Sequence, residues 1–139
     1  RPAEEAAVVA LGTAEGDIHD IGKNIVAITM RAAGLEVLDL GVDVSVERFV
    51  EAARRPDVRL VGISALLTST MRAIEAAVRE IHENSAAKVL VGGAPVTEDY
   101  AREIGADGYA PDAYLAADTA VTLVAAQAKQ QAVQAGDRP

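Results

Sequence analysis

Short strand-like runs alternate with helix-like segments along this chain, and that alternation constrains its fold more than any other feature. Four of the runs end at a glycine or a serine, as buried strands commonly do; they span residues 6–11, 35–40, 59–63 and 88–91, and a fifth short strand is predicted at 108–109. A segment with helical spacing of apolar residues follows each run. Strand–helix pairs repeated in this way predict an α/β domain built on a parallel sheet.

The predicted helices lie after these strands. The first carries Ile21, Ile25 and Ile28 at i, i+4 and i+7, which predicts an apolar face turned toward the sheet. Gly34 is expected to end this helix, and Ser45 is expected to cap the next one. Further helices are predicted around residues 71–81, over 97–104, and from a cap at 112 to about 131.

Five strand–helix pairs are commonly arranged with the strand order 2-1-3-4-5 and helices on both faces of the sheet. This is the Rossmann-type, flavodoxin-like fold. In that order strands 1 and 3 flank the topological switch point, where ligands bind beyond the carboxyl ends of the strands. The loops with unusual residues follow strands 1, 3 and 4, which would be neighbours. The fold class therefore predicts one composite site at one edge of the sheet.

The 139 residues suit a single domain, with a core expected over about residues 6–125, polar Ala/Gln-rich sequence from Gln127 on, and a tail over about 132–139. The net charge is −8 and basic residues are not clustered, which argues against a nucleic-acid partner. Cysteine is absent, so disulfides, thiolate metal sites and cysteine nucleophiles are excluded. No signal peptide or membrane-spanning run is evident, so a cytoplasmic location without a membrane partner is expected.

One loop combines the residues best suited to metal chemistry. It reads Asp17-Ile18-His19-Asp20-Ile21-Gly22 and lies between the first strand and the first helix. A carboxylate two residues from an imidazole can hold one ring nitrogen while the other nitrogen donates to a metal. Taken alone, a histidine beside an aspartate in a loop is more often a surface hydrogen-bonded pair. The interpretation as a metal site therefore depends on what the neighbouring loops contain.

The loop resembles the Asp-x-His-x-x-Gly corrinoid-binding signature of cobalamin-dependent methyltransferases. Two further motifs of that family follow in order, as Ser64-Ala65-Leu66 and Gly92-Gly93. The resemblance extends over roughly residues 6–125. The segments Gly92–Thr97 and Gly105–Ala113 look most similar to the corrinoid proteins of methylamine and methoxy-compound methyltransferase systems.

This resemblance implies a role for each matching residue. His19 would be the lower axial ligand of cobalt, and Asp17 would accept a hydrogen bond from its other ring nitrogen. Thr70 occupies the position where a hydroxyl residue continues this relay in methionine synthases. The remaining residues implied to bind the cofactor are Asp20, Ile21, Gly22, Ser64, Leu66, Thr68, Gly92 and Gly93. Ser64, Leu66 and Thr68 would line the cleft for the nucleotide tail, and the three glycines would leave room for it.

The family also implies a function. Such a protein binds cobalamin, or a related corrinoid, base-off and His-on. It carries a methyl group between partner enzymes while its cobalt cycles between methyl-Co(III) and Co(I). Its partners are one methyltransferase subunit that methylates the cobalt and another that removes the methyl group. It would have no catalytic residues of its own and would catalyse nothing alone. A helical cap module over the upper corrin face is expected from upstream sequence or from another chain.

Two other functions share the fold and the ligand motif. One is the cobalamin-binding subunit of an adenosylcobalamin-dependent mutase, and the other is a cobalamin-based sensor, which would need a DNA-binding domain. A response-regulator receiver fits less well, because Ser64 stands where an acidic phosphoacceptor is needed. Outside the motifs, His82 is expected to be solvated. Lys23 and Asn24 are expected either at the cofactor edge or exposed at the helix start.

Overall fold

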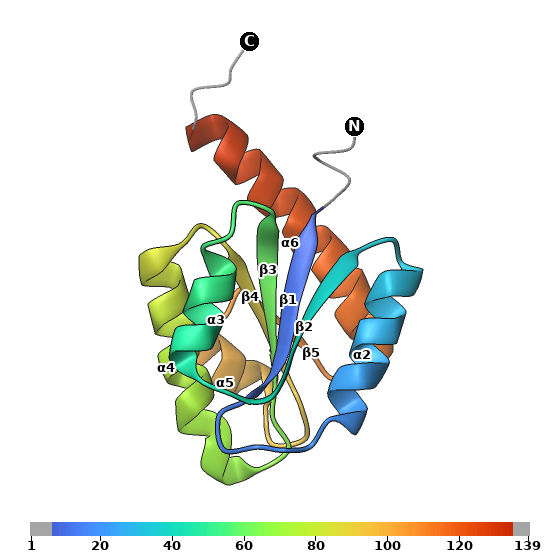
Figure 1. Ribbon diagram of the computed structural model, residues 1–139, viewed down its shortest axis with the longest axis vertical. Helices are drawn as coiled ribbons and strands as arrows, with labels where there is room; N and C mark the ends of the chain where they lie inside the picture. Colours follow the sequence, from blue (N-terminus) through green and yellow to red (C-terminus); the bar gives the residue numbers. More distant parts are fainter. Residues whose placement is uncertain (1–6, 135–139) are drawn as a thin grey trace.

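The computed structural model describes residues 7–134 and contains one five-stranded parallel sheet with the order β2-β1-β3-β4-β5 (Figure 1). The predicted fold class and strand order are therefore confirmed. The strands are β1 (Val8–Ala14), β2 (Glu36–Val44), β3 (Val58–Ser64), β4 (Lys88–Gly92) and β5 (Gly108–Ala110). The helices are α2 (Ile21–Ala32), α3 (Val46–Ala53), α4 (Met71–Asn84), α5 (Glu98–Glu103) and α6 (Ala113–Gln134), and a 3-10 turn (Thr68–Thr70) precedes α4.

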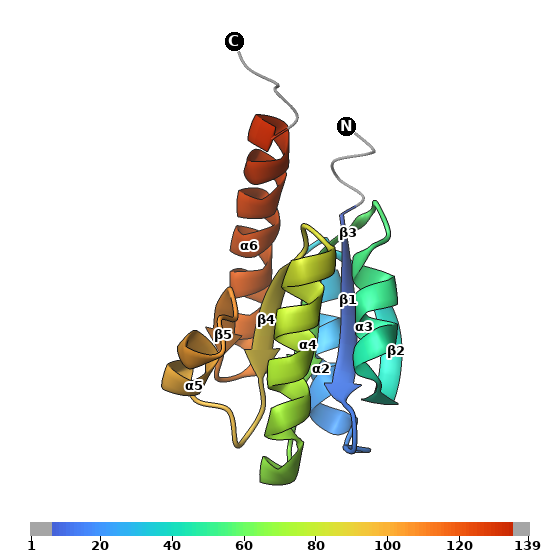
Figure 2. The ribbon, with the colours of Figure 1, turned by 90° about the vertical axis from the view of Figure 1, so that its left-hand side faces the viewer.

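Helices cover both faces of the sheet, as Figures 1 and 2 show. On one face α3, α4 and α5 pack over a core that includes Phe49 and Ile74. On the other face α2 and α6 enclose a second core, with Met30 and Leu60 at its centre. Every residue of β1 is buried, because this strand is covered on both sides.

The first two strands extend further than the sequence indicates. β1 runs through Gly12 to Ala14, and β2 runs through Gly41 to Val44. Gly12 does not end the strand; instead, a Cβ atom there would lie 3.1 Å from the ring of Phe49. Its lack of a side chain therefore serves packing. The longer strands carry residues 13 and 43 to the carboxyl edge, where the predicted site lies.

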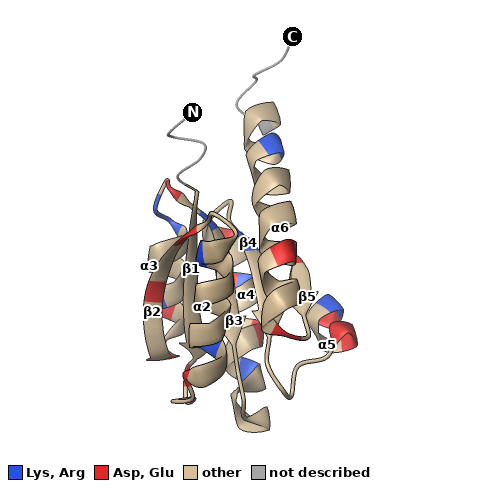
Figure 3. Cartoon of the chain, turned by 90° about the vertical axis from the view of Figure 1, so that its right-hand side faces the viewer, with Lys and Arg blue, Asp and Glu red and all other residues tan. Residues whose placement is uncertain are grey.

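The predicted apolar face of α2 is wrong. Ile21, Ile25 and Ile28 point away from the sheet and are 75%, 46% and 64% exposed. The helix instead buries Ala27 and Met30. The spacing of the isoleucines is helical, but helical spacing alone does not say which face meets the sheet. In Figure 3 the side of the molecule that α2 and the first part of α6 form carries few charged residues.

The long α6 also corrects the sequence analysis. Gln127 is buried, because its side chain fills the space between α6 and the amino-terminal edge of the sheet. Packed structure thus continues past residue 125, and residues 132–134 of the predicted tail end the helix. Residues 135–139 lie outside the described part of the chain. None of the helices from residue 7 to 134 combines the length and apolar content that a membrane crossing requires.

Candidate cofactor site

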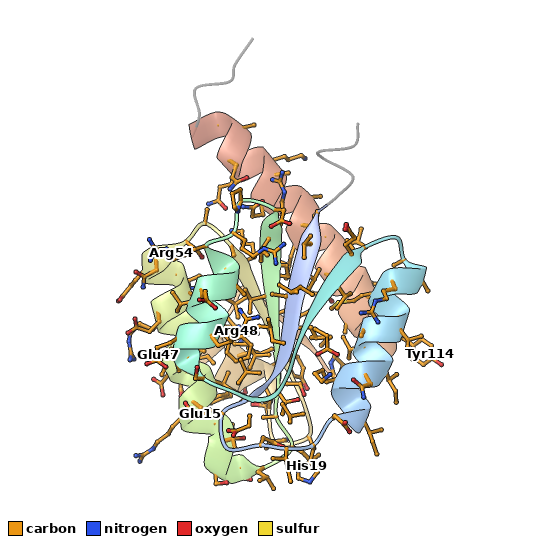
Figure 4. The ribbon with its side chains drawn as sticks, in the orientation of Figure 1. Glu15, His19, Glu47, Arg48, Arg54 and Tyr114 are labelled. Atoms are coloured by element: carbon orange, nitrogen blue, oxygen red, sulfur yellow. The ribbon has the colours of Figure 1, made fainter. Side chains whose placement is uncertain are left out.

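The candidate site lies at the carboxyl edge of the sheet, where three loops meet. They are residues 15–20 after β1, here called the ligand loop, residues 65–70 after β3 and residues 93–97 after β4. Figure 4 shows His19 at this edge of the molecule. The predicted convergence of these loops is thus present, because β1, β3 and β4 are consecutive in the sheet.

Asp17 is the most constrained side chain of the site. It is fully buried, and its Oδ2 accepts hydrogen bonds from the backbone N–H groups of Leu66 (2.6 Å) and Leu67 (3.2 Å). Its Oδ1 accepts from the backbone N–H of His19 (3.0 Å) and lies 2.7 Å from His19 Nδ1. One carboxylate therefore joins the ligand loop to the loop after β3.

These hydrogen bonds determine the charge of Asp17. Burial by itself raises the pKa of a carboxyl group, but the N–H donors of Leu66 and His19, the His19 ring and the Leu67 N–H together outweigh it. The pKa of Asp17 is lowered to about 2. The group is therefore an anion at any physiological pH, and it can only accept hydrogen bonds.

This charge also determines the tautomer of His19. Because Asp17 can only accept, Nδ1 of the imidazole must carry the proton in their contact. In the neutral ring Nε2 then holds a free electron pair. His19 is about half exposed, at 48%, and no residue in the described part of the chain hydrogen-bonds to Nε2. The side chain is oriented by a buried carboxylate and offers one nitrogen donor outward, as a metal-binding histidine does.

A cavity of about 180 Å³ opens next to the ligand loop, between the sheet and the helices α2 and α6. Four of the predicted site residues line it: Gly22, Ser64, Gly92 and Gly93. The rest of its wall is mainly apolar and includes Leu11, Val26, Met30, Leu90 and Ala116. An elongated group could therefore enter along the carboxyl edge and pass between the sheet and these two helices.

The glycines give the cavity its shape for different reasons. A Cβ on Gly22 would meet nothing within 4 Å, so a side chain there would project into open space at the cavity wall. A Cβ on Gly93 would collide with the carbonyl of Ala65, and this residue also has a φ of +119°. Gly93 is thus required by the close approach of the loops after β3 and β4, whereas Gly22 leaves room for a ligand.

The other predicted residues lie outside the cavity wall. Thr70 is buried, but its hydroxyl donates to the carbonyl oxygen of Leu67 (2.7 Å), so no direct hydrogen bond continues the relay from Asp17 to Thr70. Its connection to Asp17 runs through the backbone of Leu67, whose N–H donates to that carboxylate. The remaining four, Asp20, Ile21, Leu66 and Thr68, are exposed around the ligand loop and the loop after β3.

Two residues that hold the ligand loop were missed by the sequence analysis. The hydroxyl of Thr13, which is fully buried, donates to the His19 carbonyl oxygen (3.0 Å). Asp43 accepts from the Gly16 N–H (2.8 Å) and its own N–H donates to the Asp17 carbonyl oxygen (2.8 Å). Both lie in strand portions beyond Gly12 and Gly41, where the strands were expected to end. After Gly41, the apolar–charged–apolar alternation of Val42, Asp43 and Val44 was the available signal, whereas the residues after Gly12 offer none.

Of the two expectations for charged side chains outside the motifs, one is corrected and one is confirmed. Lys23 is neither solvated nor at the cavity wall: it is 3% exposed and its Nζ lies 2.9 Å from both carboxylate oxygens of Asp39. His82 is exposed, as expected, and its Nε2 also lies 2.7 Å from Oδ2 of Asp107 at the opposite edge of the sheet. Both side chains contact carboxylates from distant parts of the chain, and such pairs cannot be predicted from sequence spacing.

The fold and the site together define a class of protein: a parallel α/β domain that holds an elongated cofactor at its carboxyl edge beside one imidazole donor. The residues present fit a corrinoid, because His19 offers one outward ring nitrogen that could serve as an axial ligand, and the glycine-walled cavity could take an elongated tail. Residues 7–118 match the family described as the B12 binding domain. The chain belongs to this family, and its cofactor is cobalamin or a related corrinoid.

Relatives with established names support the same assignment. The chain is 46% identical over 109 residues to dimethylamine corrinoid protein 2 of Methanosarcina mazei, which covers 76% of this chain and 51% of that protein. It is also 46% identical over 123 residues to a corrinoid protein of Desulfitobacterium hafniense, covering 86% and 55%. The chain thus spans about half the length of the curated relatives it matches.

Solved structures share the fold closely. The monomethylamine corrinoid protein of Methanosarcina barkeri superposes with a TM-score of 0.79 at 37% identity, over 88% of this chain and 60% of that one. The methanol:cobalamin methyltransferase complex MtaBC of the same organism gives 0.79 at 35% identity, over 85% and 46%.

Proposed function

We propose that this chain is the cofactor-carrying domain of a corrinoid protein in a methyltransferase system, and that it binds cobalamin with His19 in place of the cofactor's own lower base. When bound, the corrinoid supplies a cobalt centre that accepts and releases a methyl group. The chain's own residues hold and orient the corrinoid. The proposed domain comprises residues 1–139, and it needs partner enzymes for each transfer.

The observation that carries this proposal is the contact between Asp17 and His19. A buried carboxylate with a pKa of about 2 holds the Nδ1–H of an exposed imidazole at 2.7 Å, which directs Nε2 outward as an electron-pair donor. A surface hydrogen-bonded pair would not need a carboxylate anchored by backbone N–H groups from a second loop. The same contact couples ligation to protonation, because an imidazole that gains a second proton loses the donor pair.

The names of the relatives favour methyl transfer over the other two functions. The matched proteins include dimethylamine and monomethylamine corrinoid proteins and a methanol:cobalamin methyltransferase complex. We infer that this chain likewise works between one subunit that methylates the cofactor and one that demethylates it. A helical cap over the corrin, from upstream sequence or another chain, remains part of the proposal.

The surface around the site supports docking of such partners. An apolar stripe runs from the ligand loop along α2 and includes Ile18, Ile21, Ile25 and Ile28, which are between 46% and 75% exposed. Tyr114 at the start of α6 points outward beside α2 (Figure 4). Contiguous exposed apolar side chains commonly mark protein–protein contacts.

Replacement of the imidazole tests the proposal. His19→Ala removes the axial nitrogen, so the visible spectrum of the protein reconstituted with methylcobalamin should change and its affinity should fall. His82→Ala is the matched control, because His82 also contacts a carboxylate but lies at the opposite edge of the sheet. A His19→Ala protein with the spectrum and affinity of the wild type would contradict the proposal.

The upper ligand distinguishes methyl transfer from the alternatives. Titration of the cofactor-free protein with methylcobalamin and adenosylcobalamin, followed by spectroscopy, should show no strong preference for the adenosyl form. A clear preference for adenosylcobalamin would favour a mutase subunit or a sensor, although the same His19 would serve as ligand in each.

A further inference from the structure

An ion pair between a buried lysine and a partly exposed aspartate fixes the first turn of α2 to the edge strand β2. Lys23 is 3% exposed, and its Nζ donates to Oδ1 and Oδ2 of Asp39 (both 2.9 Å) and to Oδ1 of Asn24 (2.6 Å). An ammonium group is costly to bury unless it is paired in this way. Burial raises the pKa of Asp39, but the hydrogen bonds from Lys23 and the Gly41 N–H, with the positive charges of Lys23 and Arg31, together outweigh it, and the pKa is lowered. Asp39 is therefore an anion that holds Lys23 in place.

The same strand also holds the start of the ligand loop. Oδ1 of Asp39 accepts the N–H of Gly41 (2.8 Å) at a bulge, where the pairing of β1 with β2 shifts between Leu11 and Gly12. Beyond the bulge Asp43, with a φ of +51°, exchanges two hydrogen bonds with the backbone of Gly16 and Asp17, each 2.8 Å long. The bulge thus sets where Asp43 lies relative to the loop.

We propose that β2 positions His19 by holding both ends of the ligand loop, with the Lys23–Asp39 pair at the α2 end and Asp43 at the β1 end. Lys23 and Asp43 touch neither the imidazole nor the cavity wall, so they are positioning residues that act through Asp17 and the loop backbone. The significance of this positioning for cofactor binding rests on the proposed function of His19. The effect of the Lys23–Asp39 and Asp43 contacts on the stability of the ligand loop does not depend on that function, and it can be measured in the cofactor-free protein.

Hydrogen exchange of the cofactor-free protein tests the coupling. In Lys23→Met the long apolar side chain remains but the ion pair is lost, so the loop loses its anchor at the α2 end. The amide hydrogens of His19, Leu66 and Leu67, which all donate to Asp17, should exchange about tenfold faster. A tenfold change corresponds to a loss of about 1.4 kcal/mol in the local free energy of opening. Core amides such as that of Val91 should keep their protection.

Two variants separate positioning from a general loss of stability. Lys23→Arg keeps a cation that can reach both oxygens of Asp39 and should restore most of the protection. Arg48→Met removes an exposed ion pair with Glu51 (3.1 Å) and should leave the loop unchanged. Asp43→Ala, which removes one contact at the other end of the loop, should accelerate the same amides as Lys23→Met does.

A second measurement uses the reconstituted protein. The fraction of bound cobalamin with the spectrum of the His19-ligated form should fall in Lys23→Met and recover in Lys23→Arg. Unchanged exchange at His19 and Leu66 in both Lys23→Met and Asp43→Ala would overturn the inference, and so would equal acceleration of all core amides. If the wild type bound no cobalamin, the proposed function would fail while the exchange experiment still decided the coupling.

Discussion

At the scale of single residues, Asp17 controls the site through its charge. It is buried, it receives three backbone N–H groups and the ring N–H of His19, and it remains ionised to about pH 2. An aspartate in that environment stabilises the folded protein as well as the imidazole. Its contribution to stability and its proposed contribution to ligation therefore arise from the same hydrogen bonds.

This double role predicts a specific pH dependence of stability. The folded-state pKa of Asp17 lies below its ordinary value of 3.8, so its contribution is complete above about pH 5 and is lost as the pH falls through about 2. Asp17→Asn should lower the free energy of unfolding at pH 7 by roughly 2 kcal/mol, and the difference from wild type should shrink between pH 4 and pH 2. Urea titrations at several pH values measure both.

The matched control for that experiment is Asp57→Asn. Asp57 pairs with Arg55 at 2.9 Å, which lowers its pKa, but both side chains are nearly half exposed. Such a pair contributes little to stability. A constant difference between Asp17→Asn and the wild type from pH 7 to pH 2 would contradict the assigned role of the Asp17 charge.

At the scale of an element, α2 lines the cavity with one face and exposes the other face to solvent. Gly22 lines the cavity with open space in front of it, whereas the isoleucines of this helix face outward. A glycine at this position lowers the intrinsic helix propensity of α2. The expected benefit is room for the nucleotide tail of the cofactor.

Gly22→Ala should separate stability from binding. Its backbone is helical, so alanine fits without strain and should raise the free energy of unfolding by up to about 1 kcal/mol. The added methyl group narrows the cavity, so the affinity for cobalamin should fall. Thermal unfolding and spectroscopic titration measure the two effects.

Arg31→Ala is the control for that variant. Arg31 is exposed on the same helix and does not line the cavity, so its replacement should leave cobalamin affinity unchanged. A Gly22→Ala protein that binds cobalamin as tightly as the wild type would show that the tail does not pass this helix.

At the scale of the whole molecule, the carboxyl and amino-terminal edges of the sheet differ in what covers them. The carboxyl edge carries the proposed cofactor site, while the second half of α6 covers the amino-terminal edge. There Gln127 donates to the Ala86 carbonyl oxygen (3.3 Å) and accepts from Arg59 (3.1 Å), and Gln131 also accepts from Arg59 (2.8 Å).

Loss of this buried amide should destabilise the fold without affecting the site. Gln127→Ala leaves Arg59 and the Ala86 carbonyl with fewer partners and should lower the free energy of unfolding by about 1–3 kcal/mol. Gln130→Ala, at an exposed position further along the same helix, should change stability little. Cobalamin affinity should match the wild type in both, and reduced affinity in Gln127→Ala would show that the two edges are coupled.

The sequence by itself determined the fold class, and it predicted the common strand order and the convergence of three loops at one edge, which the structure confirms. Alternating periodicities and ordered motifs are local signals, and the rules for connecting parallel strands convert them into topology. The caps at Ser45 and Asp112 were likewise predicted, and each accepts the backbone N–H expected of it.

Only the tertiary structure decided which side of each element faces what. The isoleucines of α2 have the spacing of a core face yet lie in solvent, and Lys23 is buried because Asp39 lies opposite it on a strand sixteen residues later. The support that Thr13 and Asp43 give to the ligand loop is equally non-local. Helical spacing fixes which residues share a face, but burial and ion pairing depend on what that face meets. The proposed ligand His19 was therefore evident from its motif, and the residues that hold its loop were not.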